Sequence, residues 1–103
     1  MKPSEVLRAA RAKIEKAENW TQGVYARDSF RNPVEPWSQS ACAWSVGGAL
    51  FAAKSRGGEW RRAAKALSDQ LPSGVAHVDD IRTHAEVLAL FDRAIAAAEA
   101  RGE

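Results

Sequence analysis

Alanine dominates the apolar residues of this 103-residue chain. There are 21 alanines, whereas leucine, isoleucine, valine and phenylalanine together number only 19. Alanine has the highest helix propensity, and its short side chain lets two helix backbones approach closely. No β-branched run alternates with a period of two, which argues against a sheet. We therefore predict an all-α fold.

The length, the apolar segments and the cysteine count limit the class of protein. A chain of 103 residues fits one domain of common size, so we expect residues 1–103 to form a single compact helical domain. No apolar stretch approaches the roughly 18 residues that span a bilayer, and the N-terminus carries no apolar signal region. A lone cysteine cannot form an internal disulfide. These features predict a cytoplasmic protein that has no membrane partner.

Four segments show helical periodicity, at about 4–18, 41–54, 59–71 and from 83 to about 98. Ser38 or Ser40 can cap the second segment, and Thr83 with Glu86 forms a capping box for the last one. The second segment is apolar on both sides, which predicts a buried central helix. Its Gly47-Gly48 pair predicts that a neighbouring backbone or ring packs closely against it.

The periodicity disappears between residues 19 and 37. Gln22-Gly23, Asn32-Pro33 and Glu35-Pro36 are turn or extended signals, so we predict one long loop between the first two helices. Loops of this length are uncommon in small domains and are usually functional or disordered. Four aromatic residues favour an ordered, packed loop: Trp20, Tyr25, Phe30 and Trp37.

Three motifs resemble those of a family of short bacterial and phage-encoded proteins, a domain of unknown function. They are WTQG at 20–23, Cys42 followed by GAL at 48–50, and THAEVLALFDRA at 83–94. The last motif is the most specific, and the resemblance covers nearly the whole chain. It implies a compact, mostly helical domain and no particular activity.

The long loop is the strongest candidate for a recognition surface. Tryptophan, tyrosine and arginine dominate the energetics of protein interfaces. The candidate partner-binding residues are therefore Tyr25, Arg27, Arg31 and Trp37. In the alternative interpretation the tryptophans only cover the open side of an alanine-rich core. We expect Trp20 to anchor the loop while Tyr25, Arg27 and Trp37 stay at least partly exposed.

An enzymatic alternative depends on Cys42. A cysteine near Trp44, with Gln22 upstream and His77 or His84 downstream, resembles a papain-like hydrolase in order but not in spacing. On a helical wheel Cys42 shares the apolar face of Val46, Leu50 and Ala53, where a thiol fills a core. We therefore predict a buried, slowly reacting structural thiol and no catalytic residue. A cysteine-dependent hydrolase or transferase is the alternative.

A metal site is not expected. His77, Asp79, Asp80 and His84 are the densest cluster of possible ligands, but a structural zinc site needs four ligands dominated by cysteine or histidine. The acidic residues of this cluster are better explained as turn caps. We predict neither a metal nor a cofactor.

A nucleic-acid-associated factor is the second alternative. The net charge of +2 is too small to attract nucleic acid in bulk. Local basic residues are Lys54, Arg56, Arg61, Arg62 and Lys65, of which the last three share one face of the third helix and should be exposed. Charged helix faces are usually only solvated. The function that we favour is a non-enzymatic interaction or regulatory module that binds a protein partner.

Overall fold

The structure, a computed structural model, describes residues 2–53, 58–71 and 83–103. These residues form four α-helices, a single 3-10 turn and a two-stranded sheet. The helices are α1 (Pro3–Lys13), α2 (Val46–Ala52), α3 (Gly58–Ser68) and α4 (His84–Ala100); the 3-10 turn is η1 (Ala17–Asn19), and the strands are β1 (Ala26–Arg27) and β2 (Ala43–Trp44). The fold is mostly helical, as predicted, but the expectation of no sheet is wrong for four residues.

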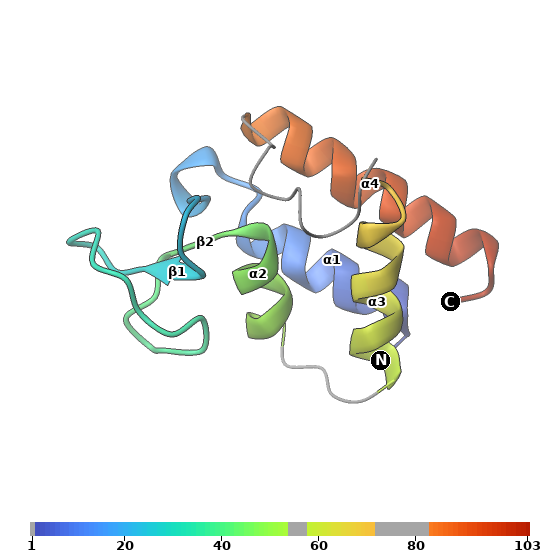
Figure 1. Cartoon of the computed structure of the whole chain (residues 1–103), viewed down its shortest axis with the longest axis horizontal. Coiled ribbons are helices and arrows are strands. Elements are labelled where there is room, and N and C mark those ends of the chain that lie inside the picture. The colour runs from blue at the N-terminus through green and yellow to red at the C-terminus, as the bar shows by residue number, and fades with distance from the viewer. Residues whose placement is uncertain (1, 54–57, 72–82) are drawn as a thin grey trace.

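α1 is the central helix, because it packs against each of the other three helices (Figure 1). α4 lies alongside it, and two exposed ion pairs join them, Arg8 to Glu99 at 2.7 Å and Arg11 to Asp92 at 2.8 Å. The prediction that the second helix is central is therefore wrong. α2 has only seven residues, and its Phe51 is 43% exposed although the apolar pattern had placed it in the interior.

The hydrophobic core combines a few large side chains with many alanines. The largest fully buried side chains all come from α1 and α4 or the residue after α1: Phe91, Leu7, Ile14, Leu90, Val6 and Val87. Alanines from all four helices complete the core, among them Ala10, Ala49, Ala63, Ala66, Ala94 and Ala98. Short side chains at these positions let the helices approach closely, as the composition predicted.

Local sequence signals predicted the start of α4 but not the start of α2. Thr83 caps α4 as predicted, its hydroxyl accepting a hydrogen bond from the Glu86 N–H at 3.1 Å. α2 is capped by Ser45, whose hydroxyl accepts from the Gly48 N–H at 3.0 Å, and neither Ser38 nor Ser40 starts it. The residues just before Ser45 are extended because they pair with β1, so the helix begins five residues later than predicted.

We expect Thr83→Ala to lower the free energy of unfolding by about 1 kcal/mol, the usual cost of removing a side-chain N-cap. The Glu86 N–H would lose its partner at the exposed start of α4. Chemical denaturation monitored by circular dichroism measures the change. Thr83→Ser keeps the capping oxygen and is the matched control; equal losses in both variants would contradict this role.

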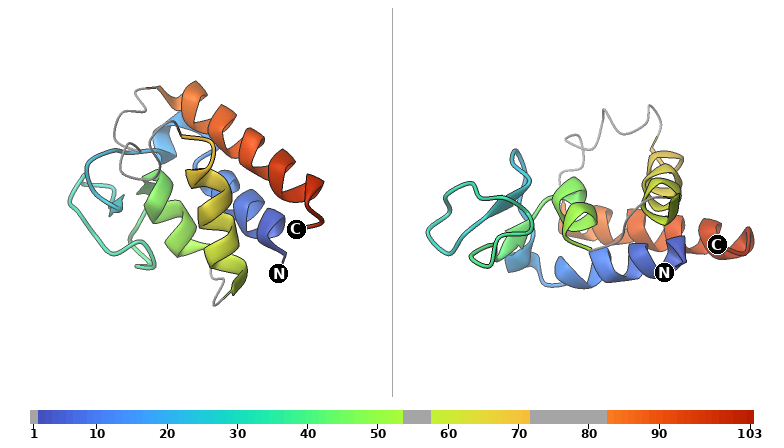
Figure 2. Two further views of the ribbon diagram at one scale, coloured as in Figure 1. Left: turned by 45° about the vertical axis from the view of Figure 1, so that its right-hand side comes forward. Right: turned by 90° about the horizontal axis from the view of Figure 1, so that it is seen from below.

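Residues 20–45, between η1 and α2, form what we call the aromatic lobe. β1 pairs antiparallel with β2, with Ala26 opposite Trp44 and Arg27 opposite Ala43. Both outer sides of this pair are also covered: the Thr21 N–H donates to the Trp44 carbonyl and the Val34 N–H to the Ala26 carbonyl, each at 3.0 Å. Two further views show the lobe at one end of the molecule, beyond the helices (Figure 2). The predicted loop is ordered, but it contains a strand.

None of the described helices is long and apolar enough to cross a bilayer.

Candidate interaction surface

Gly48 lets the aromatic lobe approach α2 closely. At Gly48 an added Cβ would overlap the carbonyl oxygen of Tyr25, so only glycine permits this approach. At Gly47 a Cβ would lie 3.4 Å from the Tyr25 ring, an ordinary packing distance. The Ser45 N–H donates to the same Tyr25 carbonyl at 3.0 Å. The close approach predicted from this glycine pair is confirmed, and it fixes β1 on α2.

A tight turn orders the tip of the lobe. One carboxylate oxygen of Asp28 accepts hydrogen bonds from the N–H groups of Phe30 and Asn32, both at 2.9 Å. The Asp28 N–H also donates to the Asn32 carbonyl at 2.9 Å. Arg31 takes a φ of 69°, the left-handed conformation that closes the turn. Phe30 is therefore displayed from a fixed backbone, with 82% of its surface exposed.

Arg27 connects the segments of the lobe and is half-buried. Its guanidinium donates to the Thr21 hydroxyl and to the Arg31 carbonyl, each at 2.9 Å. The predicted partial exposure of Arg27 is confirmed, but its N–H groups donate to other residues of the lobe. We therefore assign it to the scaffold of the surface. The indole N–H of Trp44 has a similar role, since it donates to the buried Pro36 carbonyl at 2.9 Å.

The other candidate residues lie as predicted. Trp37 is 69% exposed and Tyr25 is 56% exposed, and Arg31 is exposed as well. Trp20 is half-buried and packs against the core, as expected of the anchor. Phe30 was missed as a surface residue, although the Asp28 and Asn32 that flank it are turn formers that could have signalled its exposure.

A row of aromatic rings runs from the lobe across α2 to α3. Tyr25 meets Phe51 edge-on at 5.2 Å between ring centroids, and Phe51 stacks on Trp60 at 5.3 Å. The Trp60 indole N–H donates to the Leu50 carbonyl at 3.1 Å, which fixes the last ring. The row borders a groove of about 940 Å³ whose lining includes Tyr25, Val34, Glu35, Val46, Leu50, Phe51, Trp60, Leu67 and Leu90.

Cys42 is exposed, so the prediction of a buried core thiol is wrong. The prediction rested on a helix from residue 41, but Cys42 precedes the extended pair Ala43–Trp44. Neighbouring residues of an extended chain face opposite ways, and here Ala43 is buried. The Cys42 N–H donates to the Arg27 carbonyl at 2.9 Å.

We expect Cys42 to react with a thiol reagent in the folded protein nearly as fast as in denaturant, because its side chain is exposed. A colorimetric disulfide-exchange assay under both conditions measures the two rates. The variant Cys42→Ser should give no signal and should keep the stability of the wild type. A much slower reaction in the folded state would restore the buried placement.

The Cys42 thiol makes no hydrogen bond with another described residue. His84 is 70 positions away from Ile14 in sequence, yet its Nε2 lies 2.6 Å from the Ile14 carbonyl oxygen, and its ring lies beside Trp20. No three His, Cys, Asp or Glu side chains converge within the part of the chain that is described. His77, Asp79 and Asp80 fall outside the described residues, so that part of the ligand cluster stays untested.

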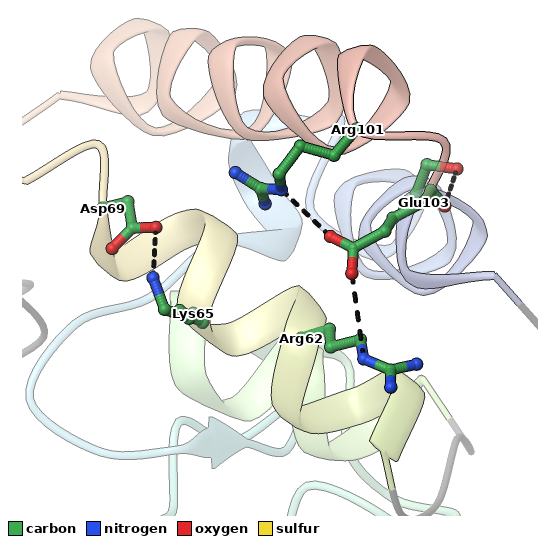
Figure 3. Close-up of polar contacts among 6 residues, drawn as sticks. Arg62, Lys65, Asp69, Arg101 and Glu103 are labelled. Atoms are coloured by element: carbon green, nitrogen blue, oxygen red, sulfur yellow. Dashed lines mark hydrogen bonds and ion pairs between the residues drawn. The ribbon is translucent and has the colours of Figure 1, made fainter.

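The basic face of α3 is exposed as predicted for Arg61, Arg62 and Lys65. Two of the three charges have an acidic side chain nearby (Figure 3): Lys65 pairs with Asp69 at 2.8 Å, and Arg62 Nε lies 3.7 Å from a carboxylate oxygen of Glu103, a side chain that also pairs with Arg101 at 3.0 Å. Lys54 and Arg56 lie outside the described residues. Pairing of this kind weakens attraction to phosphate, and binding of nucleic acid stays a prediction.

The structure thus defines a small, mostly helical fold with a projecting, ordered aromatic lobe. The model of a family of unknown function, DUF6197, matches residues 1–97, and the chain belongs to this family. No curated protein and no solved structure matches the chain.

Proposed function

We propose that this protein is a non-enzymatic interaction module that binds a protein partner through its aromatic lobe. The observation that carries the proposal is the exposure of Phe30 and Trp37, at 82% and 69%, on a scaffold fixed by hydrogen bonds. Leaving such rings in water forgoes the favourable burial of large apolar surfaces. A partner that covers them recovers that free energy.

The order of the lobe adds to this argument. Binding costs less entropy when the contact residues are already held in place. The Asp28 turn holds Phe30, and Trp37 directly follows the buried Pro36, whose carbonyl accepts from the Trp44 indole. Arg31 is exposed between them in sequence and adds a residue type that interfaces favour. The exposed thiol suits a reducing compartment, so we place the interaction in the cytoplasm.

The test is affinity capture from a lysate of the native host, with quantitative mass spectrometry of the bound proteins. We expect Trp37→Ala to leave stability nearly unchanged and to remove the specific partner by at least about tenfold, as loss of an interface hot spot does. Gln39→Ala, also exposed on the lobe, is the matched control and should retain the partner.

Phe30→Ala is a second, independent test of the same surface. It should weaken capture of the same partner, because Phe30 is the most exposed of the large aromatic side chains. A set of captured proteins that is identical for the wild type, Trp37→Ala and Phe30→Ala would contradict the proposal. The rings would then have no role in recognition.

A further inference from the structure

The groove beside the aromatic row has the dimensions of a ligand site. Its volume is about 940 Å³, and small-molecule sites typically measure about 300–1,000 Å³. Its walls come from four separated parts of the chain: Tyr25 and Val34 from the lobe, Phe51 from α2, Trp60 from α3 and Leu90 from α4. These apolar and aromatic side chains suit the body of an apolar ligand rather than a polar one.

One acidic residue, exposed to solvent, is among the residues that line the groove. Glu35 is the only charged residue among the described residues that line the groove. Its carboxylate makes no hydrogen bond or ion pair with any other described residue. The other polar side chains of the lining are weaker candidates for recognition: the Ser45 hydroxyl already caps α2, and Ser68 is uncharged. The charge that this lining complements is therefore positive.

The main chain of the lobe offers a bound molecule no open strand edge. The Trp44 carbonyl already accepts from the Thr21 N–H, and the Ala26 carbonyl accepts from the Val34 N–H. An extended peptide cannot add to β1 or β2 without displacing these bonds. Strand addition is therefore not how the groove binds a molecule, and its side chains offer apolar contact, the Tyr25 hydroxyl and one carboxylate.

We propose that this groove binds a small molecule that has an apolar aryl or alkyl body and a cationic nitrogen paired with Glu35. Tyr25, Phe51 and Trp60 contact the body, and the face of an exposed aromatic ring also attracts a cation. This site is separate from the Phe30 and Trp37 surface, since neither of these residues lines the groove.

The test compares three probes that share one phenylbutyl body and differ in the charge of the head group: phenylbutylamine, phenylbutanol and phenylvalerate. Each is titrated into the full chain labelled with nitrogen-15, and the Trp60 indole and Gly47 amide resonances report occupancy of the groove. We expect the amine to bind about two- to fivefold more tightly than the alcohol, the range for an exposed ion pair. The carboxylate should bind most weakly.

Four variants locate the effect. Glu35→Gln should abolish the preference for the amine, whereas Glu18→Gln, an exposed acid outside the groove, should keep it. Ala64→Phe places a ring in the groove and should abolish binding of all three probes. Trp37→Ala should change none of these titrations, so failure of this site and failure of the partner surface are distinguishable.

Three results would each overturn the proposal. One is the absence of any Trp60 or Gly47 shift with millimolar phenylbutylamine. The second is binding of phenylvalerate at least as tight as binding of the amine, and the third is an unchanged amine preference in Glu35→Gln. Any of them would show that the groove takes no cationic ligand through Glu35.

Discussion

Gly48→Ala is expected to destabilise the protein by about 3 kcal/mol, the upper end of the usual range for overpacking a packed site. The new methyl group would overlap the Tyr25 carbonyl oxygen, and a backbone atom cannot turn aside as a flexible side chain can. α2 and β1 must separate, which also strains the hydrogen bond from the Ser45 N–H to that oxygen. Urea denaturation monitored by tryptophan fluorescence measures the loss.

Gly47→Ala is the matched control for this prediction. A Cβ at Gly47 would lie at an ordinary 3.4 Å from the Tyr25 ring. Alanine is also the better helix former by about 1 kcal/mol, so this variant should be neutral or slightly more stable than the wild type. Equal effects at the two glycines would show that β1 does not approach α2 as described.

Phe91→Ala is expected to lower the free energy of unfolding by about 3 to 5 kcal/mol, because it removes a large buried side chain and leaves a cavity. Phe91 is 0% exposed and is the largest of the fully buried side chains. Thermal unfolding followed by circular dichroism is the direct measurement, and a strongly lowered midpoint is the expected outcome.

Phe30→Ala also removes a phenylalanine side chain, but from an exposed position instead of the core. Phe30 is 82% exposed, so its truncation should change the free energy of unfolding by no more than about 0.5 kcal/mol. A large loss for Phe30→Ala, or a small one for Phe91→Ala, would contradict the assignment of one ring to the core and the other to recognition.

The helices at 58–68 and 84–100 were predictable because their signals are local. The Thr83 hydroxyl needs only the backbone N–H three residues later, and that bond is present. In α3 the apolar period placed Ala63 and Leu67 inward and Arg61 outward, and the structure agrees. Capping and helical periodicity involve residues within a few positions of each other, so a sequence displays them directly.

The start of α2 was not predictable in this way. Residues 41–45 have helix-compatible apolar spacing, but they pair with residues near 26, about 18 positions earlier. A strand pair of only two residues a side leaves no alternating pattern to recognise. The misplaced start also produced the wrong environment for Cys42, since a shift from helix to extended chain changes which side chains face the core.

The sequence by itself determined the helical class and the alanine-rich core, because these follow from composition and periodicity along the chain. Only the tertiary structure decided that α1 is central, that Arg27 serves the scaffold, and that Glu35 lies in a groove with Phe51 and Trp60. The first and the last depend on residues far apart in sequence that meet only when the helices pack, whereas the Arg27 hydrogen bonds depend on how the lobe itself folds. At one position the sequence does reflect such a long-range contact. Residue 48 is a glycine, and the Tyr25 carbonyl occupies the space that a side chain would fill.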